Sequence, residues 1–246
     1  MSTERLDQLL VARGIFPTRA RARDAILRGT VQVDGAVCIK PARKTPVNAV
    51  LAADDPAAAY VSRAALKLVA GLETFGIDPS GRTCLDIGSS TGGFTQVLLE
   101  RGAARVHAID VGTDQFHPRL RGHPRVNLRE GLNARDLRPS DLDGESPDLI
   151  VSDVSFISLK LALPPALDLA RPGAQAVLLV KPQFEAGRER VGKGGLVDPA
   201  IAEAVSAELR DWLDTAADWT AGDLFPSPIA GGDGNREWLL HGTKHP

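Results

Sequence analysis

Residues 83–99, TCLDIGSSTGGFTQVLL, join a short apolar run to a glycine-rich turn and then to a second apolar run with helical spacing. This order predicts a strand, a tight turn and a helix. Gly88, Gly92 and Gly93 allow the backbone to approach a ligand closely, and the free amides at the start of the helix suit a polar or anionic group. The stretch therefore predicts a binding site at the end of a strand.

Two carboxylates flank this turn at a spacing that suits a nucleoside. Asp86 lies in the first apolar run, and Asp110 ends the next strand-like run, 22 residues beyond Gly88. An acidic side chain roughly 20 residues after the glycine turn holds the ribose hydroxyls in doubly wound nucleotide-binding proteins. A plain strand-to-helix turn beside a carboxylate is the simpler interpretation, but three glycines and two acids in matching register favour a ligand.

The glycine pattern narrows the kind of nucleoside. It reads D-x-G-x-x-x-G-G rather than G-x-G-x-x-G, so it implies no cradle for a pyrophosphate. An adenosine ligand without a diphosphate fits better, and S-adenosylmethionine is the candidate cofactor, with Asp86 near its cationic end and Asp110 near its ribose. The residues expected to bind it are Asp86, Gly88, Ser89, Ser90, Thr91, Gly92, Gly93, Asp110 and Asp153.

The elements around this turn repeat the order strand, helix, strand. This repetition predicts a doubly wound α/β fold with a mostly parallel sheet covered on both faces. One buried strand, 149–151, is followed by Asp153, and another, 177–180, is followed by Lys181. Because ligands bind beyond the carboxyl ends of such strands, these two opposite charges are expected at the same rim as the glycine turn.

Three further segments complete the larger part of the chain. A helix over 63–75, begun by Ser62, is expected to pack Leu66, Val69, Leu72 and Phe75 inward. Residues 184–199 are rich in glycine and charge, which favours a mobile flap over the site. A helix over 200–213 follows, and a last strand is expected over 237–241.

The first 50 residues form a different kind of module. They hold nine Lys or Arg against four Asp or Glu, whereas the rest of the chain holds 20 against 27. The pattern predicts a helix from residue 6 that ends near Gly14, a second helix capped by Thr18 that runs to Arg28, and a hairpin over 31–39 that turns at Asp34-Gly35. A concentrated basic excess beside a cofactor domain favours a polyanionic partner.

Composition bounds the class of protein. A chain of 246 residues with 43% hydrophobic residues can bury one substantial core and carry a small second domain. We expect domains over 1–53 and 62–246, joined by a linker over 54–61. No apolar run approaches the roughly 18 residues that span a bilayer, and charges interrupt residues 1–15 where a secretory signal needs an apolar block. The expectation is a cytoplasmic protein that does not bind membranes; the sequence leaves its oligomeric state open.

Cysteine and histidine usage predicts no metal centre. Cys38 and Cys84 fall in separate predicted domains without ligand spacing, so neither a disulfide nor a zinc site is expected. His241 and His245 are four residues apart near the C-terminus and are expected in a solvated tail.

The basic module, with its run T-R-A-R-A-R-D-A-I-L-R-G-T-V-Q-V-D-G, resembles the S-four (S4) RNA-binding module over about residues 4–50. The resemblance implies that the second helix and the adjoining strand bind structured RNA. With Phe16 as its one aromatic residue, the module is expected to bind folded RNA through phosphates and shape rather than by stacking on bases. The implied RNA-binding residues are Arg5, Arg19, Arg21, Arg23, Lys40 and Lys44.

Over the whole chain, the motifs Y-V-S-R-A-A-L-K-L, S-D-V-S-F-I-S-L, V-K-P-Q-F-E-A-G, V-G-K-G-G-L-V-D and G-N-R-E-W-L-L resemble the TlyA family. That family joins an S4 module to an FtsJ-like, Rossmann-like ribose methyltransferase, and some members carry the name haemolysin. The resemblance implies 2′-O-methylation of cytidine in ribosomal RNA with S-adenosylmethionine as the donor. The catalytic set that it implies is Lys67, Asp153, Lys181 and Glu237.

The implied chemistry assigns a role to each member of this set. A ribose 2′-hydroxyl is a weak acid that has to be aligned with the methyl group and eased toward deprotonation. Lys181 is expected to contact and polarise the hydroxyl and Asp153 to orient Lys181, while Lys67 and Glu237 complete the network. The linker sequence A-A-A-Y-V departs from the arginine-tryptophan pair of some relatives, and the chain length favours the large ribosomal subunit as substrate.

Two other functions stay open at this point. The same fold with little catalysis would be a ribosome-binding or assembly factor, although the presence of all four polar positions argues against it. A pore-forming haemolysin is the other alternative, and the sequence offers no membrane-spanning or strongly amphipathic segment for it.

Overall fold

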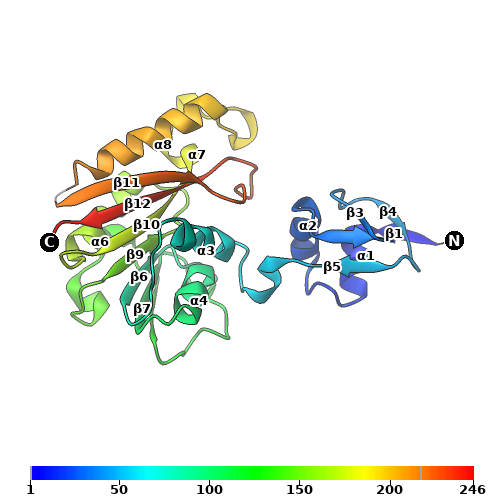
Figure 1. Cartoon of the computed structure of the whole chain (residues 1–246), viewed down its shortest axis with the longest axis horizontal. Coiled ribbons are helices and arrows are strands. Elements are labelled where there is room, and N and C mark those ends of the chain that lie inside the picture. The colour runs from blue at the N-terminus through cyan, green and yellow to red at the C-terminus, as the bar shows by residue number, and fades with distance from the viewer. Residues whose placement is uncertain (1, 217) are drawn as a thin grey trace. The chain divides into compact units, whose positions relative to one another are not determined.

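The computed structural model describes residues 2–216 and 218–246. Contacts within the chain divide it into two compact units, Met1–Ala59 and Tyr60–Pro246 (Figure 1). Among the described residues, no helix is long and apolar enough to cross a membrane.

The smaller unit packs two helices against short strands. Its helices are α1 (Leu6–Ala12) and α2 (Arg19–Leu27), and its strands are β1 (Thr3–Arg5), β2 (Val31–Val33), β3 (Ala36–Val37), β4 (Lys44–Pro46) and β5 (Leu51–Ala53). β1 pairs with β4, and β2 lies between β3 and β5, all antiparallel. The buried residues of α1, α2 and β2 form one apolar core.

The predicted helices and hairpin of this unit are confirmed. The Thr18 hydroxyl accepts a hydrogen bond from the Arg21 amide at 3.3 Å and so caps α2. Asp34 and Gly35 both have positive φ, 51° and 79°, as the two-residue turn between β2 and β3 requires. The predicted hairpin over 31–39 is wrong at its end, because β3 ends at Val37 and Ile39 is exposed.

The larger unit is built on a seven-stranded sheet in the order β11-β12-β10-β9-β6-β7-β8 (Figure 1). The strands are β6 (Thr83–Ile87), β7 (Arg105–Asp110), β8 (Val126–Glu130), β9 (Leu149–Ser152), β10 (Gln175–Val180), β11 (Trp219–Pro226) and β12 (Trp238–Lys244). The five from β6 to β10 are parallel, and β12 pairs antiparallel with both β10 and β11. The predicted doubly wound, mostly parallel sheet is confirmed.

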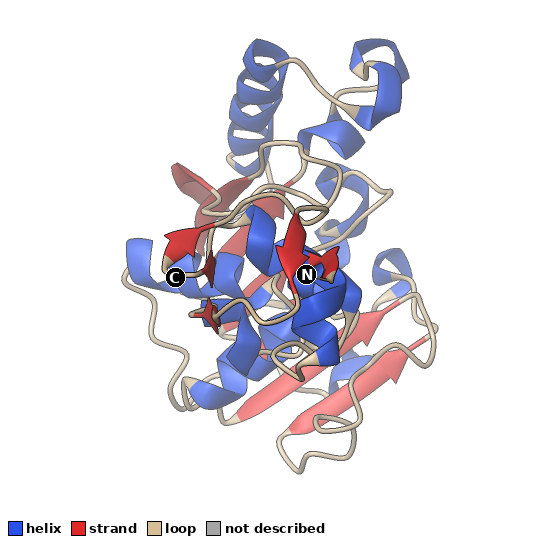
Figure 2. Cartoon of the chain, turned by 90° about the vertical axis from the view of Figure 1, so that its right-hand side faces the viewer, coloured by secondary structure: helices blue, strands red, loops and turns tan. Residues whose placement is uncertain are grey.

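Helices cover both faces of this sheet because side chains alternate along each buried strand (Figure 1 and Figure 2). Leu85 and Ile87 of β6 join the core beneath α5, α6 and α8, whereas Cys84 joins the core beneath α3 and α4. The helices are α3 (Ala65–Thr74), α4 (Gly93–Glu100), α5 (Leu159–Ala162), α6 (Pro164–Leu169), α7 (Pro182–Glu185) and α8 (Pro199–Leu213).

Three features of the larger unit differ from the sequence-based expectation. His241 does not lie in a solvated tail: it belongs to β12, and its ring stacks on Phe75 with centroids 5.2 Å apart. The inner face of α3 is formed by Ala65, Leu68 and Leu72, with Leu66 only half-buried, because the helix is rotated relative to the predicted stripe. β8 and β11 were not predicted, since neither shows a clear apolar alternation.

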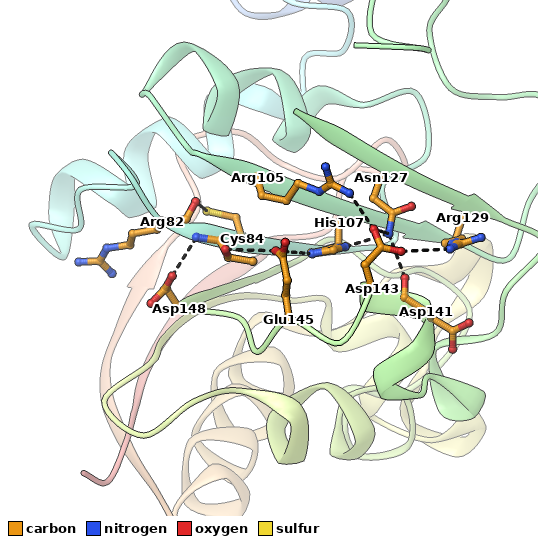
Figure 3. Close-up of polar contacts among 11 residues, drawn as sticks. Arg82, Cys84, Arg105, His107, Asn127, Arg129, Asp141, Asp143, Glu145 and Asp148 are labelled. Atoms are coloured by element: carbon orange, nitrogen blue, oxygen red, sulfur yellow. Dashed lines mark hydrogen bonds and ion pairs between the residues drawn. The ribbon is translucent and has the colours of Figure 1, made fainter. Parts of the chain in front are cut away.

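A polar seam fastens residues 141–148 to the strands of the sheet (Figure 3). Glu145 Oε2 lies 3.1 Å from Nε2 of the buried His107, and Asp143 pairs with Arg105 at 2.7 Å. Asp148 accepts a hydrogen bond from the Thr83 amide at 2.8 Å, at the start of β6. These contacts hold the chain where it enters β9, whose other end carries Asp153.

Candidate active site

The turn between β6 and α4 is shaped by a glycine that no other residue can replace without strain. Gly88 has φ +82°, and a Cβ added there would lie 3.0 Å from the backbone oxygen of Asp153. This close approach brings the end of β6 against the end of β9. The two strand ends therefore form one continuous rim.

Asp110, at the end of β7, is held in place at this rim by backbone amides. Its Oδ2 accepts a hydrogen bond from the Ser90 amide and its Oδ1 accepts one from the Gly112 amide, both at 2.7 Å. The carboxylate lines a cavity of about 520 Å³. Of the residues expected to bind the cofactor, Gly88, Ser90, Asp110 and Asp153 line this cavity.

Asp86 lies beneath the turn rather than on the cavity wall. Its side chain is fully buried, and its Oδ2 accepts a hydrogen bond from Thr95 Oγ1 at 2.6 Å. Within residues 2–216 and 218–246, its Oδ1 has no hydrogen-bond partner. Burial, together with the nearby charges of Asp153 and Asp110, raises the pKa of this carboxyl to about 7, against the opposing effect of the hydrogen bonds from Thr95.

The remaining four residues of the turn support its shape. An added Cβ at Gly92 would lie 2.6 Å from Leu120, and one at Gly93 would lie 2.9 Å from Cβ of Ser62, so both glycines serve close packing of α4. The Thr91 carbonyl accepts a hydrogen bond from the His117 amide at 3.1 Å. The Ser89 hydroxyl is buried and has no hydrogen-bond partner in the described part of the chain.

These features fit an adenosine-type cofactor. The cavity is large enough for a nucleoside, and a carboxylate stands on its wall. One oxygen of Asp86, beneath the turn that borders the cavity, and the hydroxyl of Ser89, in that turn, are buried and have no hydrogen-bond partner among the described residues. Asp110 would hold ribose hydroxyls there. Across the described residues, no group of three or more His, Cys, Asp or Glu side chains could hold a metal ion.

Four charged side chains from separate elements meet beside this cavity as two ion pairs. Lys67 Nζ of α3 lies 2.5 Å from Glu237 Oε2, next to the start of β12. Lys181 Nζ, just after β10, lies 2.6 Å from Asp153 Oδ1 and donates a hydrogen bond to Ser155 Oγ at 2.8 Å. The structure therefore brings together all four residues of the predicted catalytic set.

The four side chains are largely withdrawn from water. Lys67, Glu237 and Lys181 are at most 9% exposed, yet all four residues line a second cavity of about 600 Å³. Burial raises the pKa of the Glu237 carboxyl, while the charges of Lys67 and Lys181 oppose that shift. Two positive and two negative groups thus balance each other at this site.

The two cavities share a wall formed by Asp153, Ser155 and Phe156. Phe156 is 90% exposed and has φ 66°, an uncommon backbone conformation for a bulky residue. Its ring lies 5.0 Å from that of Phe184, centroid to centroid. A ligand in one cavity and a ligand in the other would therefore meet at Asp153, beside an exposed aromatic pair.

Comparison with known proteins gives the family. A family model described as FtsJ-like methyltransferase matches residues 60–244, and one described as S4 domain matches residues 4–51. The 16S/23S rRNA (cytidine-2′-O)-methyltransferase TlyA of Mycobacterium tuberculosis is 45% identical over 239 residues, which cover 96% of this chain and 88% of that protein. The chain belongs to the TlyA family.

Two further matches show the range of names within this family. The 23S rRNA (cytidine-2′-O)-methyltransferase TlyA of Campylobacter jejuni is 40% identical over 190 residues, 76% of this chain and 72% of that protein. A solved structure from Streptococcus thermophilus that is named as a hemolysin aligns with a TM-score of 0.72 at 39% identity and covers 100% of this chain and 90% of that one. The resemblance to the TlyA family predicted from the motifs is confirmed, and the larger unit is a methyltransferase domain.

The S4 domain of this TlyA-family chain carries the residues expected to bind RNA. Asp7 joins Arg5 and Arg19, each at 2.9 Å. Arg23, Lys40 and Lys44 are exposed, and Arg21 is half-buried. The structure thus brings two of the six predicted residues into one cluster.

The sequence analysis missed several residues that shape the site. Ser155, Phe156 and Phe184 stand in motifs that were recognised, but their exposed or turn positions show no periodicity that marks them. Asn235 is a fourth such residue, and it is 3% exposed. Its side-chain Oδ1 accepts a hydrogen bond from the backbone amide of Val197 at 2.9 Å, and its Nδ2 donates one to the Gly195 carbonyl at 2.8 Å. Asn235 thereby ties the glycine-rich segment to the loop before β12. The predicted mobility of that segment stays a prediction.

Proposed function

We propose that this protein transfers the methyl group of S-adenosylmethionine to the 2′-hydroxyl of a cytidine in ribosomal RNA, with the large subunit as the favoured substrate. The observation that carries the proposal is the set of two ion pairs, largely withdrawn from water, that line one cavity and reach the wall it shares with the other cavity at Asp153. The names of the Mycobacterium and Campylobacter relatives support the reaction, and both names include 23S RNA.

The cavity beside Asp110 takes the cofactor in this proposal. S-adenosylmethionine, when bound, supplies an electrophilic methyl group on a sulfonium. Asp110 binds the ribose hydroxyls of the adenosine, and its carboxylate is already oriented by the amides of Ser90 and Gly112. The buried carboxyl of Asp86 supports the turn from below, and its Oδ1 has no hydrogen-bond partner within the described residues.

The larger cavity takes the target nucleotide. Lys181 Nζ would contact the 2′-oxygen and stabilise the negative charge that develops on it. The bond from this oxygen to the methyl carbon would form as the methyl–sulfur bond breaks, with S-adenosylhomocysteine as the leaving group and the hydroxyl proton released to water. Asp153 and Ser155 fix the position of this ammonium group, so that little reorganisation is needed during the reaction. Lys67 and Glu237 line the same cavity and neutralise each other's charge beside the Lys181–Asp153 pair.

The aromatic pair gives the target base a surface. A base in RNA has to leave its stack before an enzyme can enclose its ribose, and exposed aromatic rings stabilise such an unstacked base. Phe156 and Phe184 line the same cavity as Lys181. They therefore suit a nucleotide rather than a small polar substrate.

The direct test uses purified full-length protein, isolated ribosomal subunits and methyl-labelled cofactor. We expect label in the large subunit, and mapping of the modified ribose is expected to find it on the 2′-oxygen of a cytidine. Label on a base, or on a different nucleotide, would contradict the proposal. Stable binding to a subunit without any transfer would instead identify a ribosome-binding factor.

A further inference from the structure

The S4 domain contains a buried carboxylate whose oxygens are occupied by two arginines. Asp7 lies in the first turn of α1 and is 1% exposed. Its Oδ1 accepts a hydrogen bond from Arg5 Nε at 3.0 Å, and its Oδ2 accepts one from Arg5 Nη2 at 2.9 Å. The same Oδ2 accepts a third from Arg19 Nε at 2.9 Å.

The two arginines reach this carboxylate from different elements. Arg5 ends β1 and Arg19 begins α2, 14 positions later in the sequence. Their side chains remain 35% and 57% exposed although the carboxylate between them is covered. One negative charge thus gathers two positive charges at the surface, and a net positive charge is left there.

Both guanidinium groups keep donors for a further ligand. The contacts with Asp7 use Nε and Nη2 of Arg5 and Nε of Arg19. No other hydrogen bond joins these two groups to the part of the chain that the structure describes. A guanidinium fork matches the oxygens of a phosphate group, so the free donors of the pair suit the backbone of a nucleic acid.

Asp7 stays ionised under all ordinary conditions. The hydrogen bonds and charges of Arg5 and Arg19, that from Arg5 above all, lower the pKa of its carboxyl to about 2 against the effect of burial. The carboxylate is therefore a permanent anchor. Long arginine side chains that are already held lose less conformational freedom when they bind.

We propose that Asp7 is a positioning residue for RNA binding: it holds Arg5 and Arg19 as a preformed pair whose remaining N–H donors bind a backbone phosphate. This inference rests on the proposed function, because it takes ribosomal RNA as the ligand. It also makes a prediction opposite to that of simple charge counting. If only charge mattered, loss of the Asp7 carboxylate would strengthen binding to a polyanion. If Asp7 positions the two arginines, the same change should weaken binding.

The experiment measures binding of the full-length protein to isolated large ribosomal subunits over a series of salt concentrations. For Asp7→Asn we expect affinity at least about fivefold weaker, although the protein gains positive charge, and a salt slope smaller by about 1. The matched control is Glu4→Gln, an exposed acid on the neighbouring strand, which is expected to bind as tightly as the wild type or slightly more tightly. Equal or tighter binding by the Asp7→Asn protein would overturn the inference.

A second variant keeps the test independent of any folding defect in the Asp7→Asn protein. Arg19→Lys keeps the charge and removes the fork, so we expect it to bind about as weakly as Arg19→Ala. Wild-type affinity in the Arg19→Lys protein would overturn the inference. Absence of binding by the wild-type protein to either subunit would overturn the proposed function itself, so the two failures are distinguishable.

Discussion

The two domains each bring cationic and carboxylate side chains together, but in different proportions and at different depths. In the S4 domain, Arg5 and Arg19 share Asp7, and both arginines remain partly exposed. In the methyltransferase domain, two lysines face two carboxylates, and the Lys67–Glu237 side chains are only 7% and 2% exposed. An exposed excess of positive charge suits the binding of a polyanion, whereas a buried balance suits chemistry at one atom, because charges interact more strongly away from water.

The largest effect is expected from loss of Lys181. Lys181→Ala should lower the methyl-transfer rate about 10²- to 10⁴-fold, because the group that polarises the hydroxyl is removed. Binding of the ribosomal subunit should be unchanged, since Arg5, Asp7 and Arg19 of the S4 domain are intact. The control is Lys160→Ala, an exposed lysine outside both cavities, which should keep full activity. Single-turnover methylation and subunit binding measure the two quantities; near-normal transfer after Lys181→Ala would refute the assignment.

The free energy of unfolding should fall more when one partner of the buried Lys67–Glu237 pair is lost than when both partners are replaced by apolar residues. Glu237→Gln leaves the Lys67 ammonium buried without its partner and should reduce the free energy of unfolding by about 3–5 kcal/mol. The double variant Lys67→Met/Glu237→Leu should recover most of that stability but stay inactive. Denaturant unfolding and methylation assays separate these outcomes. A double variant that is both stable and active would mean that the pair has no part in the reaction.

Salt concentration should affect RNA binding by the exposed arginines of the S4 domain much more than it affects the reaction at the buried ion pairs of the methyltransferase domain. Between about 50 and about 200 mM salt, the KM for ribosomal subunits should rise steeply, because the release of counterions from the phosphates is less favourable when the salt concentration in solution is higher. The rate at saturating substrate should change little, since the side chains of the two ion pairs are largely shielded from solvent. Steady-state kinetics at several salt concentrations measures both. If the saturated rate falls as steeply as the affinity, the catalytic cluster is not shielded as described.

A smaller effect concerns His107, whose partner Glu145 belongs to the polar seam (Figure 3). Burial lowers the pKa of His107 from its ordinary value of 6.5, so the unfolded chain takes up the proton first. Its contribution to stability is therefore complete above about pH 6.5 and declines as the pH falls below that value. His107→Gln should flatten this decline between pH 7 and pH 5. The exposed His245→Gln is the control, and thermal unfolding across this pH range is the measurement.

Local patterns predicted the parts of the fold that local physics determines. Thr18 as a cap, Asp34-Gly35 as a turn and the buried strands before Asp153 and Lys181 follow from side-chain type and periodicity. β8 and β11 did not follow from them, because their side chains are only partly buried and their pairing depends on neighbours distant in sequence. His241 was misjudged for the same reason, since Phe75 lies far from it along the chain.

The candidate site likewise contains residues that the sequence indicated and contacts that only the structure shows. The spacing of Gly88 and Asp110 indicated the cofactor rim, and the family resemblance supplied Lys67 and Glu237. No pattern could show that Glu237 pairs with Lys67 across 170 positions. Likewise, Asp7 is an ordinary acidic residue in the first turn of a helix until the structure brings Arg5 and Arg19 to it.

The central claim is that cofactor and target ribose occupy separate cavities that meet at Asp153. Binding of S-adenosylhomocysteine, measured by calorimetry in the presence of large ribosomal subunits, tests it most directly. Asp110→Ala should weaken this binding about 10- to 100-fold, because a charged hydrogen-bond acceptor for the ribose is lost, whereas Lys181→Ala should leave it within about twofold of the wild type. Equal losses in both variants, or unchanged binding after Asp110→Ala, would contradict the account.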